Sequence, residues 1–209
     1  FASWLSREAN EASRIKKDMP IMVALGNPPY SGESANKGEW ILELLDDYKK
    51  EPSGGRLQEK NSKWINDDYV KFIRLGEYYV EKNGEGILAY ITNHSYLDNP
   101  TFRGMRWHLM NTFDYIYILD LHGNSKKKEV APNGKPDKNV FDIQQGVAII
   151  VAIKDHRTVS KAPLATVQHA DLWGDRQTKY NFLEKNTLAS WRWEKLTPSK
   201  NLYLFVPRN

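Results

Sequence analysis

Hydrophobic residues follow two kinds of spacing along the chain, and short polar or glycine-rich segments separate the runs. Apolar positions that recur at helical period predict helices over residues 2–17, 40–48, 64–82 and 102–111. Short apolar runs predict strands over residues 21–25, 86–92, 115–121 and 147–153. Asn83 and Gly84 are typical of a helix end. Helices and strands therefore alternate through most of the chain.

This order of elements indicates the fold class. Strand, helix and strand follow one another over residues 86–121 with short connections, which is typical of a parallel sheet built from right-handed crossovers. Residues 31–62 are rich in polar residues and glycine and are expected to form a flexible insertion. The alternation stops later in the chain, so we expect a boundary near residue 160, followed by a short strand and a short helix. The sequence predicts an α/β fold with a C-terminal extension.

Length and composition restrict the class of protein and the compartment to which the chain can belong. The chain of 209 residues is long enough for one α/β domain and part of a second, and because it begins at Phe1 we interpret it as a fragment or a processed chain. It contains no cysteine, which excludes disulfide scaffolds and thiolate metal sites and fits a cytoplasmic setting. The longest apolar stretch, residues 146–153, is too short to span a bilayer, so we expect no membrane partner.

Net charge and aromatic content are weaker evidence for a nucleic-acid partner. The net charge is +4, which helps a polyanionic partner to associate but is common in proteins that have none. Seven Trp and eleven Tyr provide flat side chains of the kind on which unstacked bases rest. Composition alone does not choose a function.

The residues Asn27, Pro28, Pro29 and Tyr30 directly follow the first predicted strand. Two consecutive prolines remove two backbone donors and hold the chain extended. The Asn27 side-chain oxygen and the Pro28 carbonyl can then accept hydrogen bonds from both N–H bonds of an exocyclic amine and aim its nitrogen at a methyl donor. Tyr30 offers a face for an extruded base. The plain alternative is a turn after a strand.

The four-residue string resembles the catalytic motif of amino-methyltransferases, which transfer a methyl group from S-adenosylmethionine to an amine or amide. The order of the predicted elements, Asn139-Val140-Phe141 before the last long strand, and Asp171-Leu172-Trp173-Gly174 with Arg176 are similar to DNA N6-adenine methyltransferases of the gamma order. Within that order the chain looks like the single-chain restriction-modification enzymes that fuse nuclease, helicase and methylase parts.

The resemblance implies a partial Rossmann-like sheet, the second half of a class I S-adenosylmethionine-dependent methyltransferase. Residues 1–160 would form the target-base half of the catalytic domain, and residues 161–209 a C-terminal extension or the start of a target-recognition region. Asn27, Pro28, Pro29 and Tyr30 would be catalytic, and Tyr30 and Phe141 would bind the adenine. Simple core packing of Phe141 stays open as an alternative. The partners would be double-stranded DNA and upstream domains of the same polypeptide, in the cytoplasm of a bacterium or an archaeon.

The sequence departs from this family in one respect. No glycine-rich turn from a strand into a helix, followed by an acidic residue after the next strand, is present to hold the cofactor. In the gamma order this motif precedes the position of Asn27, so we expect it to lie upstream and expect the chain alone to have little activity and to bind S-adenosylmethionine poorly. The first strand would then have an unpaired edge, which favours a non-native homodimer.

Other features leave alternatives open. Five histidines, His94, His108, His122, His156 and His169, show no metal-ligand spacing, so no metal site is expected. The run of Lys126 to Lys128 is either a solvated loop or a contact to phosphates. Two alternative functions stay open. The chain could methylate a protein glutamine side chain, whose amide nitrogen poses the same geometric problem as the adenine amino group, or it could be a non-catalytic DNA-binding module of a restriction complex.

Overall fold

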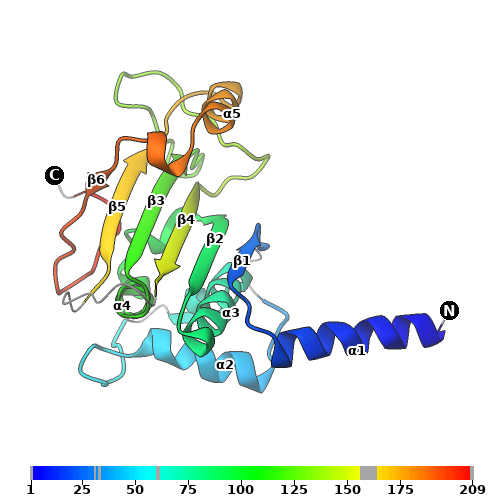
Figure 1. The fold of residues 1–209 in the computed structure, drawn as a ribbon. Coiled ribbons are helices and arrows are strands. Elements are labelled where there is room, and N and C mark those ends of the chain that lie inside the picture. Colours follow the sequence, from blue (N-terminus) through cyan, green and yellow to red (C-terminus); the bar gives the residue numbers. More distant parts are fainter. Residues whose placement is uncertain (1, 31, 33, 60–61, 156–163, 208–209) are drawn as a thin grey trace.

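The computed structural model describes residues 2–30, 32, 34–59, 62–155 and 164–207, which form one mixed sheet with helices around it (Figure 1). The α-helices are α1 (Ala2–Asp18), α2 (Glu39–Asp46), α3 (Asp68–Asn83), α4 (Arg103–Thr112) and α5 (Arg176–Lys185). The strands are β1 (Val23–Gly26), β2 (Gly86–Asn93), β3 (Tyr115–His122), β4 (Val147–Lys154), β5 (Thr166–Asp171) and β6 (Glu194–Lys195). Short 3-10 helices are η1 (Asp47–Lys49), η2 (Ser62–Asn66), η3 (His94–Tyr96), η4 (Pro100–Phe102) and η5 (Leu188–Ser190).

The helices and strands predicted up to residue 155 are confirmed, with their ends shifted by a few residues. Gly84 caps α3 in the left-handed conformation, with φ at 80°, which explains why that helix stops where the sequence predicts. The insertion over residues 31–62 contains α2, η1 and the start of η2. No described helix is long and apolar enough to cross a membrane.

The strand order within the sheet is β1-β2-β4-β3-β5-β6. Strands β1 and β2 are parallel, and so are β3 and β5, whereas β4 runs antiparallel between β2 and β3. The predicted crossover from β2 through α4 to β3 therefore joins two parallel strands, but β4 is inserted between them, which the sequence pattern did not indicate. Because of this topology the carboxyl ends of β1, β2 and β3 and the amino end of β4 lie at the same edge of the sheet.

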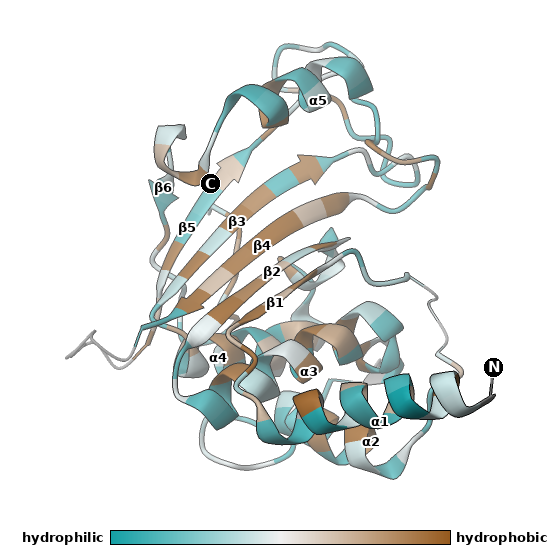
Figure 2. Ribbon diagram, turned by 45° about the vertical axis from the view of Figure 1, so that its right-hand side comes forward, coloured by the Kyte–Doolittle hydropathy of each residue, from teal (hydrophilic) through white to brown (hydrophobic). Residues whose placement is uncertain are grey.

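One face of the sheet carries the main core. Helices α2, α3 and α4 lie on this face (Figure 2), and the strand residues that point toward them are fully buried. Leu88, Ile116, Ile118 and Ile150 are each 0% exposed. Alternating side chains of the same strands point to the opposite face, as the period of a strand requires. The helices therefore fix the sheet from one side.

The expected boundary near residue 160 lies outside the described residues, as does His156. Beyond it, β5 pairs with β3 over residues 115–120 and 166–171, and it is part of the same sheet. The division into residues 1–160 and 161–209 stays a prediction. The strand expected over residues 164–167 and the helix over 178–185 correspond to β5 and α5, which begin two residues later and two residues earlier, respectively.

Candidate active site

The Asn27–Tyr30 loop leaves the sheet directly after β1. Asn27 and Pro29 are exposed, Pro28 is buried and Tyr30 is half-buried. The Tyr30 hydroxyl donates a hydrogen bond to Asn27 Oδ1 at 3.2 Å. This bond fixes the direction of the Asn27 amide, while the carbonyl oxygen keeps a second lone pair for another donor. A solvent-facing acceptor of defined orientation therefore stands at the carboxyl edge of the sheet.

The Tyr30 ring is held by aromatic packing. It meets Tyr69 of α3 edge-on, with ring centroids 6.2 Å apart and planes at 89°. Burial raises the pKa of the Tyr30 hydroxyl well above its usual value, so this group stays protonated and acts as the donor to Asn27. The ring and the amide of the motif thus position each other.

The chain after the motif is tied to the amino end of α3. Gly32 N–H donates to Asp67 Oδ2 at 3.0 Å, and Ser34 Oγ donates to Asp68 Oδ1. The buried Lys71 donates to Ser34 Oγ at 2.8 Å, and burial lowers the pKa of its ammonium group. At the described residues this segment is therefore anchored by several hydrogen bonds.

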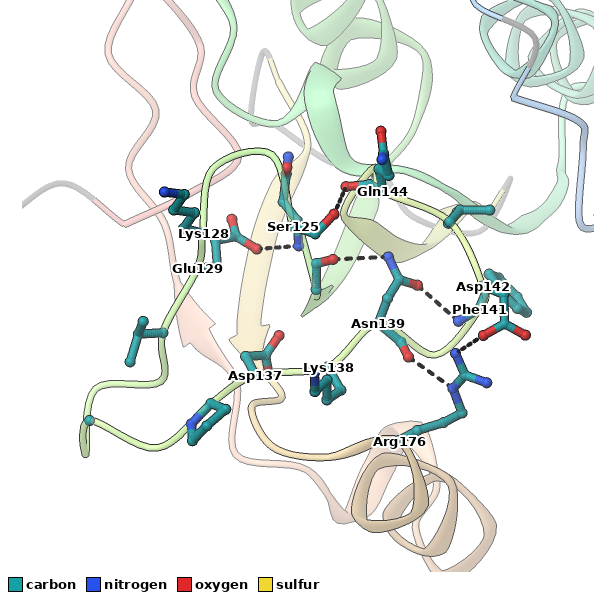
Figure 3. A pocket seen from close by; sticks show the side chains of 16 residues that line it. Ser125, Lys128, Glu129, Asp137, Lys138, Asn139, Phe141, Asp142, Gln144 and Arg176 are labelled. Atoms are coloured by element: carbon teal, nitrogen blue, oxygen red, sulfur yellow. Dashed lines mark hydrogen bonds and ion pairs between the residues drawn. The ribbon is translucent and has the colours of Figure 1, made fainter.

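Phe141 lies in a hollow of about 770 Å³ that residues 123–144 form together with Arg176 (Figure 3). Asn139 organises this segment, since its Nδ2 donates to Gly123 O at 3.1 Å and its Oδ1 accepts from the Phe141 N–H at 2.8 Å. Arg176 Nη2 is paired with Asp142 at 2.6 Å. The backbone at Phe141 is therefore well positioned.

Tyr30 and Phe141 both pack against the same group of buried residues. This group consists of Leu119, Leu121, Val140, Val147 and Leu172. The structure therefore brings the two sequence-predicted aromatic residues to one hydrophobic cluster from two separate loops. The role of Phe141 in holding a base stays a prediction, beside its packing role.

The sequence prediction missed a cluster of histidines and carboxylates at the ends of β2, β3 and β5. His94 Nδ1 lies 3.1 Å from Asp120 Oδ1, and His122 Nε2 lies 2.8 Å from Asp171 Oδ1. His169 Nδ1 lies 3.8 Å from Asp171 Oδ2. Burial opposes charge on Asp120, but the hydrogen bond from His94 outweighs it and lowers the pKa of the Asp120 carboxyl.

Two short patterns could have indicated this cluster. Asp120 and His122 alternate on β3, His169 and Asp171 alternate on β5, and the register places Asp120 opposite Asp171. These donors also lie close enough to hold a metal ion, within 4.8 Å of one another in sets of three. His94 and His122 are already hydrogen bonded to Asp120 and Asp171, which makes these two pairs a brace of the sheet edge. His169 is not hydrogen bonded to Asp171, and its buried Nε2 has no hydrogen-bond partner among the described residues.

Comparison with known proteins places the chain among restriction-modification enzymes. The sequence profile of the Eco57I restriction-modification methylases matches residues 3–127. The fold is similar to that of a nuclease-deletion mutant of the Type ISP restriction-modification enzyme LlaGI in complex with a DNA substrate mimic, with a TM-score of 0.78 and 22% identity, covering 96% of this chain and 19% of that one. No curated protein matches the sequence.

Two further solved structures share the fold. The ATP-dependent Type ISP restriction-modification enzyme LlaBIII bound to DNA matches with a TM-score of 0.75 and 22% identity, over 96% of this chain and 13% of that one. The DrdV-DNA complex matches with a TM-score of 0.74 and 23% identity, over 93% of this chain and 19% of that one. The chain spans about a fifth or less of each matched structure.

Proposed function

Because the chain belongs to the Eco57I restriction-modification methylase family, we propose that its Asn27–Tyr30 loop presents N6 of an adenine in DNA to the methyl group of S-adenosylmethionine. The observation that carries this proposal is the exposed Asn27 amide, whose oxygen is oriented by the Tyr30 hydroxyl at 3.2 Å. The reaction would serve a restriction-modification system, as the family name states.

The residues of this chain would contribute to the reaction by orienting the adenine amino group. Asn27 Oδ1 and the Pro28 carbonyl accept hydrogen bonds from the two N–H bonds of the amino group, which draws its lone pair out of the ring and toward the methyl donor. The Tyr30 ring, braced edge-on by Tyr69, supports the extruded base by stacking. Phe141, in the loop between β3 and β4, would pack against the base as well. The proton can leave after methyl transfer, so the site needs no general base.

The cofactor would be held outside the described residues. Strand β1 is the outer strand of the sheet, and no glycine-rich turn leads from a described strand into a helix. This arrangement supports the proposal that the described residues need a further part of the polypeptide to hold S-adenosylmethionine. S-adenosylmethionine, which supplies the methyl group, would be bound by an upstream part of the same polypeptide that pairs with β1.

DNA is the proposed partner. LlaGI, LlaBIII and DrdV are each described in complex with DNA or a DNA mimic. The net charge of +4 is compatible with binding a polyanion. We therefore propose that the sheet edge with Asn27 faces duplex DNA from which one adenine is extruded.

The test is methyl transfer from labelled S-adenosylmethionine to adenine-containing DNA by the polypeptide that joins this chain to the cofactor-binding part. Asn27→Ala is expected to lower kcat by roughly 100-fold or more, the usual effect of removing one positioned hydrogen-bonding group. Tyr30→Phe keeps the ring and loses only the bond to Asn27, so it should retain more activity than Tyr30→Ala.

Three results would change the assignment. Full activity in Asn27→Ala would contradict the role of the loop. Label in a protein rather than in DNA would favour the glutamine methyltransferase, and DNA binding without any label would favour a non-catalytic module.

A further inference from the structure

Two hollows lie beside the Asn27–Tyr30 loop and share Gly32 and Trp64 as lining residues. The first, of about 380 Å³, lies at the carboxyl end of β2, and the second, of about 790 Å³, lies along the amino end of α3. Neither Asn27 nor Tyr30 lines them. The hollows are thus separate from the place where the target base would be held, although Tyr69 touches both the first hollow and Tyr30.

Trp64 is the aromatic wall between the two hollows. It is 41% exposed, whereas Tyr69 and Phe102, which also line the first hollow, are 1% and 2% exposed. Lys63 Nζ lies 5.0 Å from the Trp64 ring centroid. An exposed indole with buried rings nearby and a cation beside it is the arrangement on which unpaired bases stack.

The first hollow also offers amide donors. Asn93 Oδ1 accepts from Ser95 N–H and Asn99 Oδ1 accepts from Thr101 N–H, each at 2.9 Å. These bonds fix both side chains, and within the described residues neither Nδ2 group donates a hydrogen bond. The two amino groups are therefore available to the edge or sugar of a nucleotide.

Lys126 and Lys127 line the first hollow and belong to a turn that is held by hydrogen bonds. Asn124 Oδ1 accepts the Lys127 N–H at 3.1 Å, and the Asn124 Nδ2 lies 3.3 Å from the buried His94 Nε2. The ion pair of Lys127 with Asp98 is 3.6 Å long and about half exposed, so it contributes little and a phosphate can replace it. The turn is therefore built to present cations, which favours a phosphate contact over a solvated loop.

The second hollow is basic as well. Lys37 and Lys63 line it together with Lys71, which is already bound to Ser34. Lysines thus lie on both sides of Trp64, as expected for a strand whose backbone passes over a stacking platform. A volume of about 380 Å³ is also within the range of small-ligand sites.

We propose that Trp64 stacks on an unpaired nucleotide next to the target base, with the phosphates of that strand on Lys126 and Lys127 on one side and on Lys37 and Lys63 on the other. The identification of the strand as DNA rests on the proposed function. Stacking and phosphate contacts do not depend on sequence, so this site holds the strand and does not select the base that is methylated.

The test measures binding of a labelled single-stranded oligothymidine to the 209-residue chain by fluorescence anisotropy. Oligothymidine has no adenine, so its binding does not depend on the methylation site. Trp64→Ala should weaken binding about 10-fold, and Trp64→Phe should restore most of the loss because a smaller ring still stacks. Replacing both Lys126 and Lys127 by Gln should reduce the slope of log K against log salt by about 1.4, which is 0.7 for each phosphate contact.

Matched controls separate this site from general effects. Trp40 is 48% exposed on α2 and lines neither hollow, so Trp40→Ala should bind like the wild type. Asn27→Ala should also bind oligothymidine normally, even though it is expected to lower kcat for methylation strongly, which keeps the two proposals distinguishable. A fully paired duplex should bind without dependence on Trp64.

Normal binding by Trp64→Ala, an equal loss in Trp40→Ala, or an equal dependence of the paired duplex on Trp64 would overturn the proposal. Thermal unfolding of each variant shows whether it is folded. If Trp64→Ala is unfolded, Trp64→Leu against Trp64→Phe decides the question, because both fill the space and only Phe can stack.

Discussion

The two faces of the sheet differ in what covers them, although the same strands form both. On the face toward α2, α3 and α4, Ile116 and Leu88 are 0% exposed. On the other face, Ile87 is 37% exposed, and Leu25 at the β1 edge is 79% exposed. Figure 2 shows the hydrophobic strands with helices α2, α3 and α4 on one side, and Figure 1 shows α1 extending away from the sheet.

This difference teaches that an apolar side chain in a strand is not by itself evidence of a core. Strands that are covered on both faces read as continuous apolar runs. The chain has such runs, and helices α2, α3 and α4 cover one face of the sheet. On the other face Leu119 and Val147 are buried in a cluster against which Leu183 of α5 packs, whereas the β1–β2 side of that face is exposed within the described residues. The exposed residues at Ile87 and Leu25 therefore mark a surface suited to being covered by further structure.

The largest difference in stability between the two faces is expected when one isoleucine on each face is truncated. Ile116→Ala removes a fully buried side chain on β3 and should cost about 3 kcal/mol in the free energy of unfolding, from lost burial and the cavity that remains. Ile87→Ala on β2 should cost less than about 1 kcal/mol, because its side chain is already partly in water. Urea denaturation of the two variants measures both values, and equal losses would contradict the assignment of faces.

Much of this architecture could be predicted from the sequence. Helix α3 could be predicted because its own residues determine it: residues 64–82 are amphipathic at helical period, and Asn83-Gly84 ends the helix. The antiparallel insertion of β4 could not be predicted, since residues 147–153 read as a buried strand in either direction. Strand order depends on long-range pairing, which no local pattern encodes.

The same limit applies to the candidate site. Asn27 and Tyr30 could be proposed from the sequence because the four residues of the motif are adjacent, and the structure adds a hydrogen bond between these two side chains. Trp64 could not be proposed from the sequence, because Lys126 and Asn99, which line the same hollow, lie far away along the chain.

The face covered by α2, α3 and α4 also contains buried charged groups, so its contribution to stability is expected to depend on pH. His108 on α4 donates to the fully buried Glu77 on α3 at 2.9 Å, with Asp47 and Arg74 nearby. Burial opposes charge on both groups, but their hydrogen bond and mutual attraction outweigh it, raising the pKa of His108 and lowering that of Glu77.

The pair is therefore expected to stabilise the fold most between the ordinary pKa values of the two groups, about 4.5 and 6.5. The His108 contribution is present below its ordinary pKa and is lost as the pH rises through its raised folded value. The Glu77 contribution is present above its ordinary pKa and is lost as the pH falls through its lowered folded value. Unfolding free energies from pH 4 to 9 should show that His108→Gln loses roughly 1 to 3 kcal/mol within the window and progressively less at higher pH. A pH-independent difference would indicate that His108 acts by packing alone.

The smallest expected change in stability is at the open edge, where a change in association is expected instead. Within the described residues strand β1 pairs only with β2, and the Leu25 side chain is 79% exposed. An unpaired apolar edge recruits a second chain, so we predict that the isolated chain self-associates through β1.

Leu25→Lys should abolish this association in sedimentation equilibrium while changing the unfolding free energy by less than about 0.5 kcal/mol. Leu188→Lys, at a residue that is 38% exposed on η5, adds the same charge away from the edge and should leave association unchanged. If both variants dissociate equally, the added charge rather than the edge is responsible, and if the wild type is a monomer at all concentrations, the short β1 strand is too weak a template to pair alone.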